Sequence, residues 1–477
     1  MNATLVAVAL LLGQAPPPTG FSSRGLPDPM LPPAQSGLPL LTYDAALTSA
    51  RARNLDLKAA QARYEAAREI VWKTASGYLP QVAASGSYTR NNVGARFAAP
   101  TGLYIREGVS ETEFYAPPPT GLPGTVPTPA LTVVPTYQSI VIQEQNQWQG
   151  QISGSQAILA PSLIASIRAS TLTARASEFT FQNTRRQILF GVAQQYYAAA
   201  GLRRAAEVQA QLLEIETARE RDAQVRYDAG SVNKIFLLRA QIDKTQAEQN
   251  LRATRYGYAA SKAALAVLLE RSPDFEVDIP PDPALPADLG QLEDVAPSKR
   301  PDVLAVKTQA DAAEANKTSV VLSYLPNVGF SGAYRITNAT GFTGENTSWL
   351  FSFGLTWTLF DGGLREANLR EASANVRASA AQAASLELKS HEEVRASQLQ
   401  LESARANRDK AADQVRLAKE NLALVRVNTA AGVATYLEQE DAIGALDKAA
   451  LLLIQETLNA QLGVLALENA AGIYDPQ

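Results

Sequence analysis

The sequence contains no cysteine among its 477 residues. This absence excludes a disulfide framework, a thiol nucleophile and any cysteine-based metal site. It also excludes a lipid anchor on an N-terminal cysteine. Histidine is almost absent as well. The single one, His391, stands in a charged stretch with Lys389 and Glu393, where a solvated helix face is the simplest interpretation.

Neither sign of charge dominates the chain, since 43 Lys and Arg stand against 47 Asp and Glu and give a net charge of −4. This balance gives no reason to expect a nucleic acid as a partner. Hydrophobic residues at 46% and charged residues at 19% exclude a disordered chain. No segment beyond the N-terminus offers 18 consecutive apolar residues, so no membrane-spanning helix is expected. A membrane span would have to be a closed β-barrel.

Sequence motifs typical of catalytic, phosphate-binding or metal-binding sites are also missing. The sequence shows no phosphate-binding glycine loop, no nucleophile elbow and no cluster of metal ligands. Asp361-Gly362-Gly363 is better interpreted as a turn from a strand into a helix. We therefore predict no catalytic residue, no metal and no cofactor, and we do not expect an enzyme.

The N-terminus has the features of an export signal. An apolar run from Ala3 to Leu12 is followed by the small-x-small sequence Gly13-Gln14-Ala15. These features predict a secretory signal peptide over residues 1–15. Residues 16–40 are rich in proline and are predicted to form an extended arm.

The rest of the chain is a two-fold repeat. The first repeat covers residues 41–270. It is predicted to begin with a helix from Thr42 to Gly77, a strand from Val82 to Arg90, a long proline- and glycine-rich loop over 91–146 and a strand from Gln147 to Leu159. A proline-free helix from Ser162 to Tyr227, a tip turn at 228–231 and a helix from Val232 to Glu270 are predicted to follow.

A proline-rich linker, 271–300, leads to the second repeat, 301–477. Its predicted segments are a helix from Pro301 to Ser323, a strand pair ending in a strand from Trp349 to Phe360, a helix from Gly363 to Ala430, a tip turn at 430–434 and a helix from Thr435 to Ala470. Landmarks recur in the same order. The first repeat has Tyr78-Leu79-Pro80 and Tyr88 where the second has Tyr324-Leu325-Pro326 and Tyr334. It likewise has Trp148 and Ala229-Gly230 where the second has Trp349 and Ala431-Gly432.

The helix lengths set the architecture. A helix rises about 1.5 Å per residue, so each long helix would extend on the order of 100 Å. Each repeat is therefore expected to fold as a helical hairpin with a strand pair at the end opposite the tip turn. Ala411, Ala418 and Val425 form one seven-residue seam, and Leu417 and Leu424 form a second beside it. Two seams indicate helix neighbours on two sides, as in a tube wall, whereas a dimeric coiled-coil rod would need only one.

The strands alternate between apolar and polar residues. Phe351, Phe353, Leu355, Trp357 and Leu359 are expected on one face, with Trp148, Ile152 and Ile158 on the corresponding face of the first repeat. An apolar exterior over a polar interior is typical of a membrane barrel, although a half-buried soluble strand shows the same alternation. The export signal and the aromatic residues near the strand ends favour the membrane. Four strands cannot enclose an aqueous channel, so strands of several chains must combine.

With these motifs the sequence resembles the TolC-like outer-membrane factors of export systems. The resemblance covers about Leu40 to Ile473, and it depends on the two Tyr-Leu-Pro motifs, on Leu359-Phe360-Asp361-Gly362-Gly363 and on Arg226-Tyr227-Asp228-Ala229-Gly230-Ser231. It implies a mainly α fold with a small membrane β-barrel portion. Three protomers would form an α-helical barrel continuous with a 12-stranded β-barrel, four strands from each.

The resemblance also implies partners and a role. The homotrimer would span the outer membrane, contact its lipid and extend into the periplasm. There it would meet a periplasmic adaptor attached to an inner-membrane RND or ABC pump, which supplies the energy for efflux or type I secretion. A periplasmic adaptor, or another coiled-coil structural protein of an export system, is the alternative, because adaptors also carry long helical hairpins.

The resemblance assigns roles to individual residues by their positions in the family pattern. The tip turns expected to contact the adaptor comprise Tyr227, Ala229, Gly230, Ser231, Ala431, Gly432 and Val433. The helix-to-strand ends are Tyr78, Pro80, Tyr324 and Pro326. The membrane-facing residues are Trp148, Ile152, Phe351, Phe353, Leu355 and Trp357. Acidic residues six and nine positions after the second tip glycine line the family's entrance, which implies an acidic ring of Glu438 and Asp441. An ordinary solvated face over Glu438–Asp441 is the alternative.

The chain departs from the family at its latch. Members with a latched entrance carry Tyr three positions before the second tip glycine and Arg two positions after it, where this chain has Thr429 and Ala434. The partner acid is replaced by Phe236. The known latch therefore does not transfer, and we predict that packing around Phe236 holds the tip closed instead.

Overall fold

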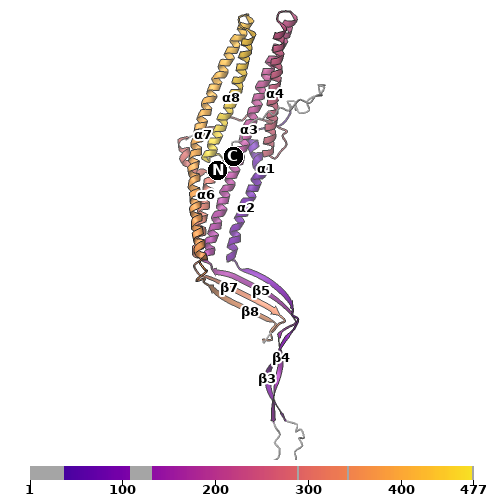
Figure 1. Ribbon diagram of the computed structural model, residues 1–477, viewed down its shortest axis with the longest axis vertical. Helices are drawn as coiled ribbons and strands as arrows, with labels where there is room; N and C mark the ends of the chain where they lie inside the picture. Colours follow the sequence, from indigo (N-terminus) through magenta and orange to yellow (C-terminus); the bar gives the residue numbers. More distant parts are fainter. Residues whose placement is uncertain (1–36, 108–130, 287–288, 341–342, 475–477) are drawn as a thin grey trace, which may run out of the picture. The chain divides into compact units, whose positions relative to one another are not determined.

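The computed structural model describes residues 37–107, 131–286, 289–340 and 343–474 (Figure 1). The predicted signal peptide, most of the predicted arm and the proline-rich centre of the 91–146 segment lie outside these residues. The chain divides into two compact units. One contains the residues up to Thr48, Ala193–Pro281 and Ala411–Leu458, and we call it the turn unit because it holds both tip turns. The other contains Ser49–Val192, Asp282–Lys410 and the residues from Asn459 onward, and we call it the sheet unit.

The predicted helices are present, with ends within a few residues of those expected. They are α1 Tyr43–Arg53, α2 Leu55–Ala75, α3 Pro161–Asp228, α4 Lys234–Leu268, α6 Pro301–Leu322, α7 Leu364–Ala430 and α8 Tyr436–Ala471. The first predicted helix differs, because it is interrupted at Asn54. There the backbone leaves the helical conformation, and the side-chain oxygen accepts a hydrogen bond from the Leu57 N–H at 3.0 Å, which caps α2. Thr42 caps α1, because its hydroxyl accepts a hydrogen bond from the Ala45 N–H at 3.3 Å.

Both tip turns have the same backbone geometry. Gly230 and Gly432 adopt φ values of 73° and 74°, a region that glycine occupies without steric cost. The next N–H in each turn, that of Ser231 or Val433, donates to the carbonyl five residues earlier at 2.8 Å. This is the Schellman pattern that ends a helix, and it occurs at equivalent positions of the two repeats.

Four of the strands form an antiparallel sheet in the order β2–β5–β7–β8 (Figure 1). The bounds are β2 Gln81–Arg90, β5 Asn146–Leu159, β7 Asn327–Thr337 and β8 Thr347–Thr356. In the first repeat Tyr88 pairs with Trp148, and in the second repeat Tyr334 pairs with Trp349. The aromatic landmarks of the sequence are thus equivalent cross-strand pairs, as the repeat requires.

Strand β8 is shorter than predicted, so the expected strand through Phe360 is wrong. It ends at Thr356, which pairs with Asn327 at the start of β7. The residue before Asn327 is Pro326, which has no N–H with which to continue the ladder. Trp357 therefore lies beyond the strand, and its indole N–H donates to the Tyr324 carbonyl at 3.0 Å.

The 91–146 segment was expected to be a loop, and this prediction is wrong for its two ends. Strands β3 Ala95–Glu107 and β4 Leu131–Gln143 pair antiparallel as a separate two-stranded sheet. The sequence of β4 is rich in β-branched residues, which favour strands. Pro100 and Pro135 made these segments look unlike strands in the sequence. Proline is nevertheless tolerated at a strand position where the backbone N–H would have no partner in the ladder.

The predicted linker, 271–300, contains short elements. β6 Glu276–Val277 pairs in parallel with β1 Leu40–Leu41, and η2 Leu289–Gln291 and α5 Leu292–Lys299 follow. In the turn unit the buried Tyr196 hydroxyl lies 2.8 Å from the Leu41 carbonyl oxygen and 3.0 Å from that of Asp278. The start of the first repeat and the linker that follows it are therefore fastened to α3.

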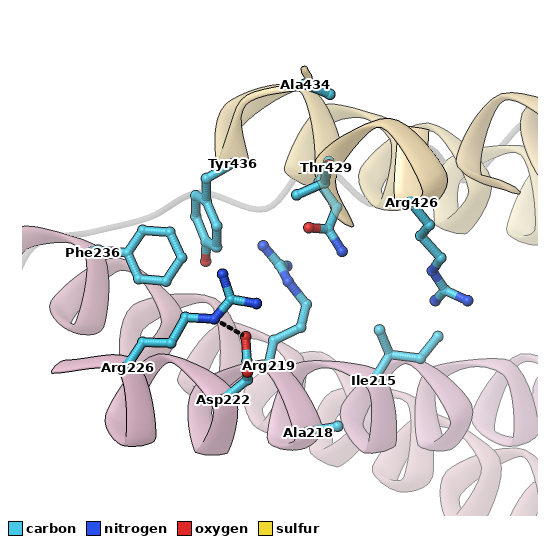
Figure 2. A pocket seen from close by; sticks show the side chains of 11 residues that line it. Ile215, Ala218, Arg219, Asp222, Arg226, Phe236, Arg426, Thr429, Ala434 and Tyr436 are labelled. Atoms are coloured by element: carbon cyan, nitrogen blue, oxygen red, sulfur yellow. Dashed lines mark ion pairs between the residues drawn. The ribbon is translucent and has the colours of Figure 1, made fainter. Parts of the chain in front are cut away.

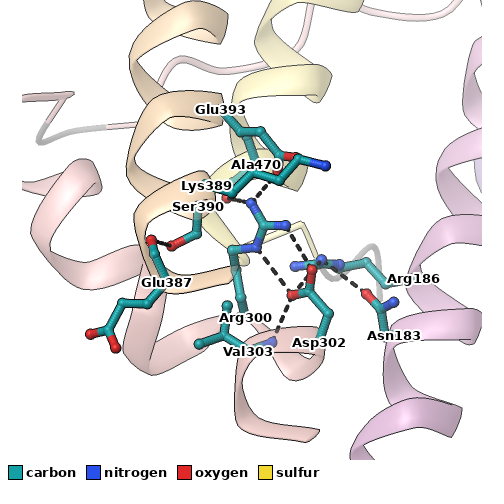
Figure 3. A network of polar contacts seen from close by, with 10 residues as sticks. All are labelled: Asn183, Arg186, Arg300, Asp302, Val303, Glu387, Lys389, Ser390, Glu393 and Ala470. Atoms are coloured by element: carbon teal, nitrogen blue, oxygen red, sulfur yellow. Dashed lines mark hydrogen bonds and ion pairs between the residues drawn. The ribbon is translucent and has the colours of Figure 1, made fainter. Parts of the chain in front are cut away.

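A buried polar network stabilises the sheet unit (Figure 3). Arg300, which is 5% exposed, donates to Asp302 at 2.7 Å, to Glu393 at 2.6 Å and to the Ala470 carbonyl at 3.3 Å. Burial alone would raise the pKa of Asp302, but the hydrogen bonds and charge of Arg300 outweigh it and hold that pKa below its usual value. The network joins α6 to α7 and to the end of α8, beside an apolar cluster that these two helices form with α5.

Among the described helices, α8 is the one long and apolar enough to cross a membrane by length and composition alone. Polar residues such as Gln455, Glu456 and Asn459 interrupt its apolar residues, so α8 contains no unbroken run of 18 apolar residues. The core helix of a soluble protein can have the same length and composition.

Candidate functional site

A pocket in the turn unit lies between the two tip hairpins (Figure 2). Its volume is about 470 Å³. The lining residues come from both hairpins and are Ile215, Ala218, Arg219, Asp222, Arg226, Phe236, Arg426, Thr429, Ala434, Tyr436 and Gln439. The three positions at which the chain departs from the latched pattern, Phe236, Thr429 and Ala434, therefore line one cavity.

Phe236 provides an aromatic contact between the hairpins. Its ring lies 4.3 Å from the Tyr436 ring, centroid to centroid, at a tilted angle. On its own hairpin Phe236 packs against the buried cluster of Ala223, Leu237 and Ala240. The contact agrees with the predicted packing around Phe236, while its role in closing the tip stays a prediction.

Arg219 provides a polar link at the same place. Its Nη1 donates to Glu216 at 2.8 Å on its own helix and to Glu440 on α8. The guanidinium carbon also lies 4.7 Å from the centroid of the Tyr436 ring, in a cation–π contact. The Tyr436 hydroxyl donates to Asp243 of α4 at 3.2 Å. Arg219 and Tyr436 therefore join the two hairpins of a single chain through hydrogen bonds to Glu440 and Asp243 and through their own cation–π contact.

The network gathers three carboxylates around one guanidinium. Ligand atoms of Glu216, Asp243 and Glu440 lie within 4.8 Å of one another, so these are the residues whose geometry could hold a metal, but Arg219 already lies among them. Burial is the largest cause that raises the pKa of Glu216 and of Glu440. Burial also raises the pKa of Tyr436 to about 12. Sequence reasoning missed this cluster because its members are distant in the chain and no motif or spacing unites them.

Glu438 and Asp441, the predicted acidic ring, are both exposed on α8. Glu438 has a second role, because its carboxylate accepts from the Thr435 N–H at 2.6 Å and the Glu438 N–H donates to the Thr435 hydroxyl at 3.3 Å. This is a capping box, and its hydrogen bonds lower the pKa of Glu438. At the equivalent position of the first repeat, the Phe236 N–H donates to the side chain of Asn233 at 3.0 Å.

The helix-to-strand ends join the sheet to the long helices. In the first repeat the Tyr78 hydroxyl accepts from the Ala160 N–H and donates to the Ala160 carbonyl, both at 3.1 Å. In the second repeat the guanidinium carbon of Arg365 lies 4.7 Å from the centroid of the Tyr324 ring. Pro80 and Pro326 stand directly before β2 and β7. Each tyrosine therefore contacts the start of the long helix in its own repeat.

The register of the sheet sorts its side chains into two faces, because paired residues lie on the same side. Trp148 and Ile152 share one face with aromatic and aliphatic residues of the second repeat, namely Tyr334, Trp349, Phe351, Phe353 and Leu355. The other face is mostly polar, with Leu350 as an exception, and carries Gln149, Gln151, Ser153, Ser331 and Ser352. Trp357, which was predicted on the apolar face, lies past the end of β8.

Comparison with known proteins supports these observations. The sequence pattern of the family described as "Outer membrane efflux protein" matches residues 46–270 and 293–473. Outer membrane protein OprJ of Pseudomonas aeruginosa is 32% identical over 141 residues, a match that spans only 28% of this chain and 28% of that relative.

Solved structures share the fold. The outer membrane protein VceC of Vibrio cholerae superposes with a TM-score of 0.70 at 19% identity, covering 90% of this chain and 96% of that one. CusC, described in terms of transmembrane channel formation, gives 0.71 at 16% identity over 90% and 92%. The CmeC outer membrane channel of Campylobacter jejuni gives 0.71 at 15% identity over 90% and 85%.

Two repeated helical hairpins and a four-stranded antiparallel sheet with one apolar face give the chain the fold of these outer-membrane channel structures. Because the family pattern matches most of the chain, the protein belongs to the outer membrane efflux protein family. Its location is the outer membrane.

Proposed function

We propose that three copies of the chain form one passive efflux duct through the outer membrane. The four-stranded sheet is the observation that supports this most. Its apolar face suits lipid and its polar face suits a wet lumen, but four strands are too few to enclose a channel. Within the described residues β2 and β8 pair on one side only, so β2 of one copy would pair with β8 of the next. Twelve strands would then close one barrel.

The helices support the same assembly. Ala411, in the first seam of α7, is 1% exposed within the single chain. Leu417 and Leu424, in the second seam, are 55% and 60% exposed. The second seam would pack against the neighbouring copy, and the helices of three copies would form a tunnel in the periplasm.

Assembly is tested by native mass spectrometry of protein extracted from the outer-membrane fraction without heating. We expect a species of three times the mass of the mature chain, which is 51.0 kDa less the predicted signal peptide, and heating should convert it to the single chain. Replacing Leu417 and Leu424 by Asp should abolish the trimer, whereas Leu388→Asp, at another exposed position of α7, serves as the control. A monomer, or recovery in the soluble periplasmic fraction as for an adaptor, would contradict the proposal.

The tip turns would meet a periplasmic adaptor coupled to an inner-membrane RND or ABC pump. Val433 is 77% exposed beside Gly432, and so is available to a partner. A photo-crosslinking residue at Val433 should yield an adduct with a periplasmic adaptor in intact cells, while the same residue at Leu388 should not. Equal adducts at both positions would argue against docking at the tip.

The turn-unit network would hold this duct closed. The contacts of Phe236 with Tyr436, of Arg219 with Glu440 and of Tyr436 with Asp243 all join the two hairpins, so opening the tip requires breaking them. Glu438 and Asp441 would present six carboxylates at the entrance of the trimer and favour cations there.

A further inference from the structure

The polar face of the four-stranded sheet carries a single charged residue, Arg335 of β7. The register pairs Ser85 with Gln151, Gln151 with Arg335, and Arg335 with Ser348, so these four side chains form one row across all four strands. Every other residue that the register places on this face is uncharged. Arg335 and Arg90 are the only charged residues of the four strands, and Arg90 pairs with Asn146 on the apolar face.

The charge of Arg335 is not neutralised by the described residues. The side chain is exposed, and its guanidinium makes no hydrogen bond or ion pair with any of them. Two carboxylates, those of Glu144 and Glu345, stand in the connections before β5 and β8, and neither is paired with Arg335. The described part of the fold therefore makes no use of this positive charge.

Arg335 lies near the end of the sheet that is remote from the helices. Strand β7 begins at Asn327, directly after the Tyr324-Leu325-Pro326 motif that follows α6. A strand in an antiparallel sheet rises about 3.4 Å per residue, so Arg335 lies about 27 Å further along β7. The helices extend into the periplasm in the proposed duct, and this end of the sheet is then the exit.

We propose that the three Arg335 side chains of the trimer form a basic ring inside the barrel near its exit, and that this ring favours the passage of anionic solutes. The inference rests on the proposed duct, in which the polar face of the sheet lines the lumen. Because the three copies are related by symmetry, the three guanidinium groups stand at the same height. No other charge on this face of the described strands opposes them.

The dimensions of the barrel make such a ring effective. Twelve strands spaced about 4.8 Å apart and tilted by about 40° enclose a backbone diameter of about 24 Å. The side chains project inward from this wall, so a solute on the axis lies within roughly one Debye length, about 8 Å, of each guanidinium. Rings of charged side chains at such distances select the sign of the permeating ion. Arg335 at the exit would thus act in the direction opposite to Glu438 and Asp441 at the entrance.

The test is the ratio of cation to anion permeability, measured from the reversal potential of the purified trimer in planar bilayers across a potassium chloride gradient. Arg335→Gln removes the charge, and Arg335→Lys keeps it. Arg90→Gln is the matched control, because it removes the same charge from the apolar face of the same sheet. Arg335→Gln should raise the ratio at least about twofold, whereas Arg335→Lys and Arg90→Gln should keep the wild-type ratio.

A second readout uses the absence of cysteine from the sequence. Arg335→Cys, treated in the bilayer with a negatively charged, membrane-impermeant methanethiosulfonate, should change its conductance in three discrete steps, one for each copy. Arg90→Cys should show no such steps. This variant also places residue 335 in the lumen independently of Arg335→Gln.

An unchanged permeability ratio in Arg335→Gln, an equal change in Arg90→Gln, or the absence of steps in Arg335→Cys would overturn the inference. If the wild type in the same recordings conducts in uniform steps, the proposed duct stands and only the basic ring has failed. A correctly folded wild-type trimer that does not conduct would instead contradict the duct, and the inference with it.

Discussion

The ring of Phe236 lies 4.3 Å from the ring of Tyr436, and this contact joins the first tip hairpin to the second. Phe236 and Glu438 occupy equivalent positions of the two repeats, and the N–H of each bonds to the capping side chain three residues earlier. The repeat therefore conserves the backbone of the helix start but changes the side chain. In the first repeat the Phe236 side chain reaches the second hairpin. In the second repeat the Glu438 side chain completes the cap of its own helix.

Removing the aromatic contact should loosen the tip. An aromatic pair contributes about 0.5–1.5 kcal/mol beyond its buried area, so Phe236→Ala should raise the frequency of channel opening by about 2- to 10-fold. Single-channel recording measures this frequency directly. Ile235→Ala is the matched control, because Ile235 is 61% exposed. If Phe236→Ala opened no more often than Ile235→Ala, the contact would have no gating role.

Neutralising the proposed acidic ring should reduce cation selectivity. Glutamine also fits the last position of a capping box, so Glu438→Gln removes the charge and retains the helix cap. Together with Asp441→Asn it should lower the ratio of cation to anion permeability, measured from the reversal potential across a salt gradient. Glu420→Gln, an exposed position of α7, should leave that ratio unchanged. An unchanged ratio in the double variant would favour an ordinary solvated face.

The carboxylate cluster should make stability depend on pH. Burial, the largest cause, raises the pKa of Glu440 in the folded protein above 4.5. The folded state then binds the proton more tightly than the unfolded state. This contribution to stability is fully present below about pH 4.5 and is lost as the pH rises through the folded pKa. Glu440→Gln lacks this group. The melting temperature of the wild type minus that of Glu440→Gln should therefore increase as the pH falls from 7.5 to 4.5, and a constant difference would contradict the assignment.

The Arg300 network should be far more important for stability than an exposed ion pair between the same helices. Arg300→Ala leaves Asp302 and Glu393 without their buried partner and should cost about 3–5 kcal/mol. Lys307→Ala removes the exposed pair with Glu387 and should cost at most about 1 kcal/mol. Denaturant unfolding followed by tryptophan fluorescence compares the two variants. Similar unfolding midpoints would show that the network is not a major source of stability.

The repeat could be recognised from the sequence because its landmarks are local. Proline-free helices, glycine turns and the Tyr-Leu-Pro motifs each act through a few neighbouring residues. The turns at Gly230 and Gly432 accordingly lie where the sequence places them. The facing of the strand residues was predictable for the same reason, since the alternation around Phe351 and Phe353 leaves one apolar face.

Features that depend on contacts distant in sequence were not predictable. The end of β8 depends on its pairing with a strand that starts after Pro326, and the β3–β4 hairpin depends on pairing across the 108–130 segment. The link of Arg219 to Glu440 joins residues separated by 221 positions. No spacing rule connects such residues before the hairpins are placed side by side.

The central claim is that three chains form one conducting duct, and single-channel recording tests it most directly. Protein purified from the outer membrane without heating should insert into planar lipid bilayers and give discrete, uniform conductance steps that disappear when the oligomer is dissociated by heat. Protein that is trimeric and correctly folded yet gives no conductance, or steps that persist for the dissociated chain, would contradict the account.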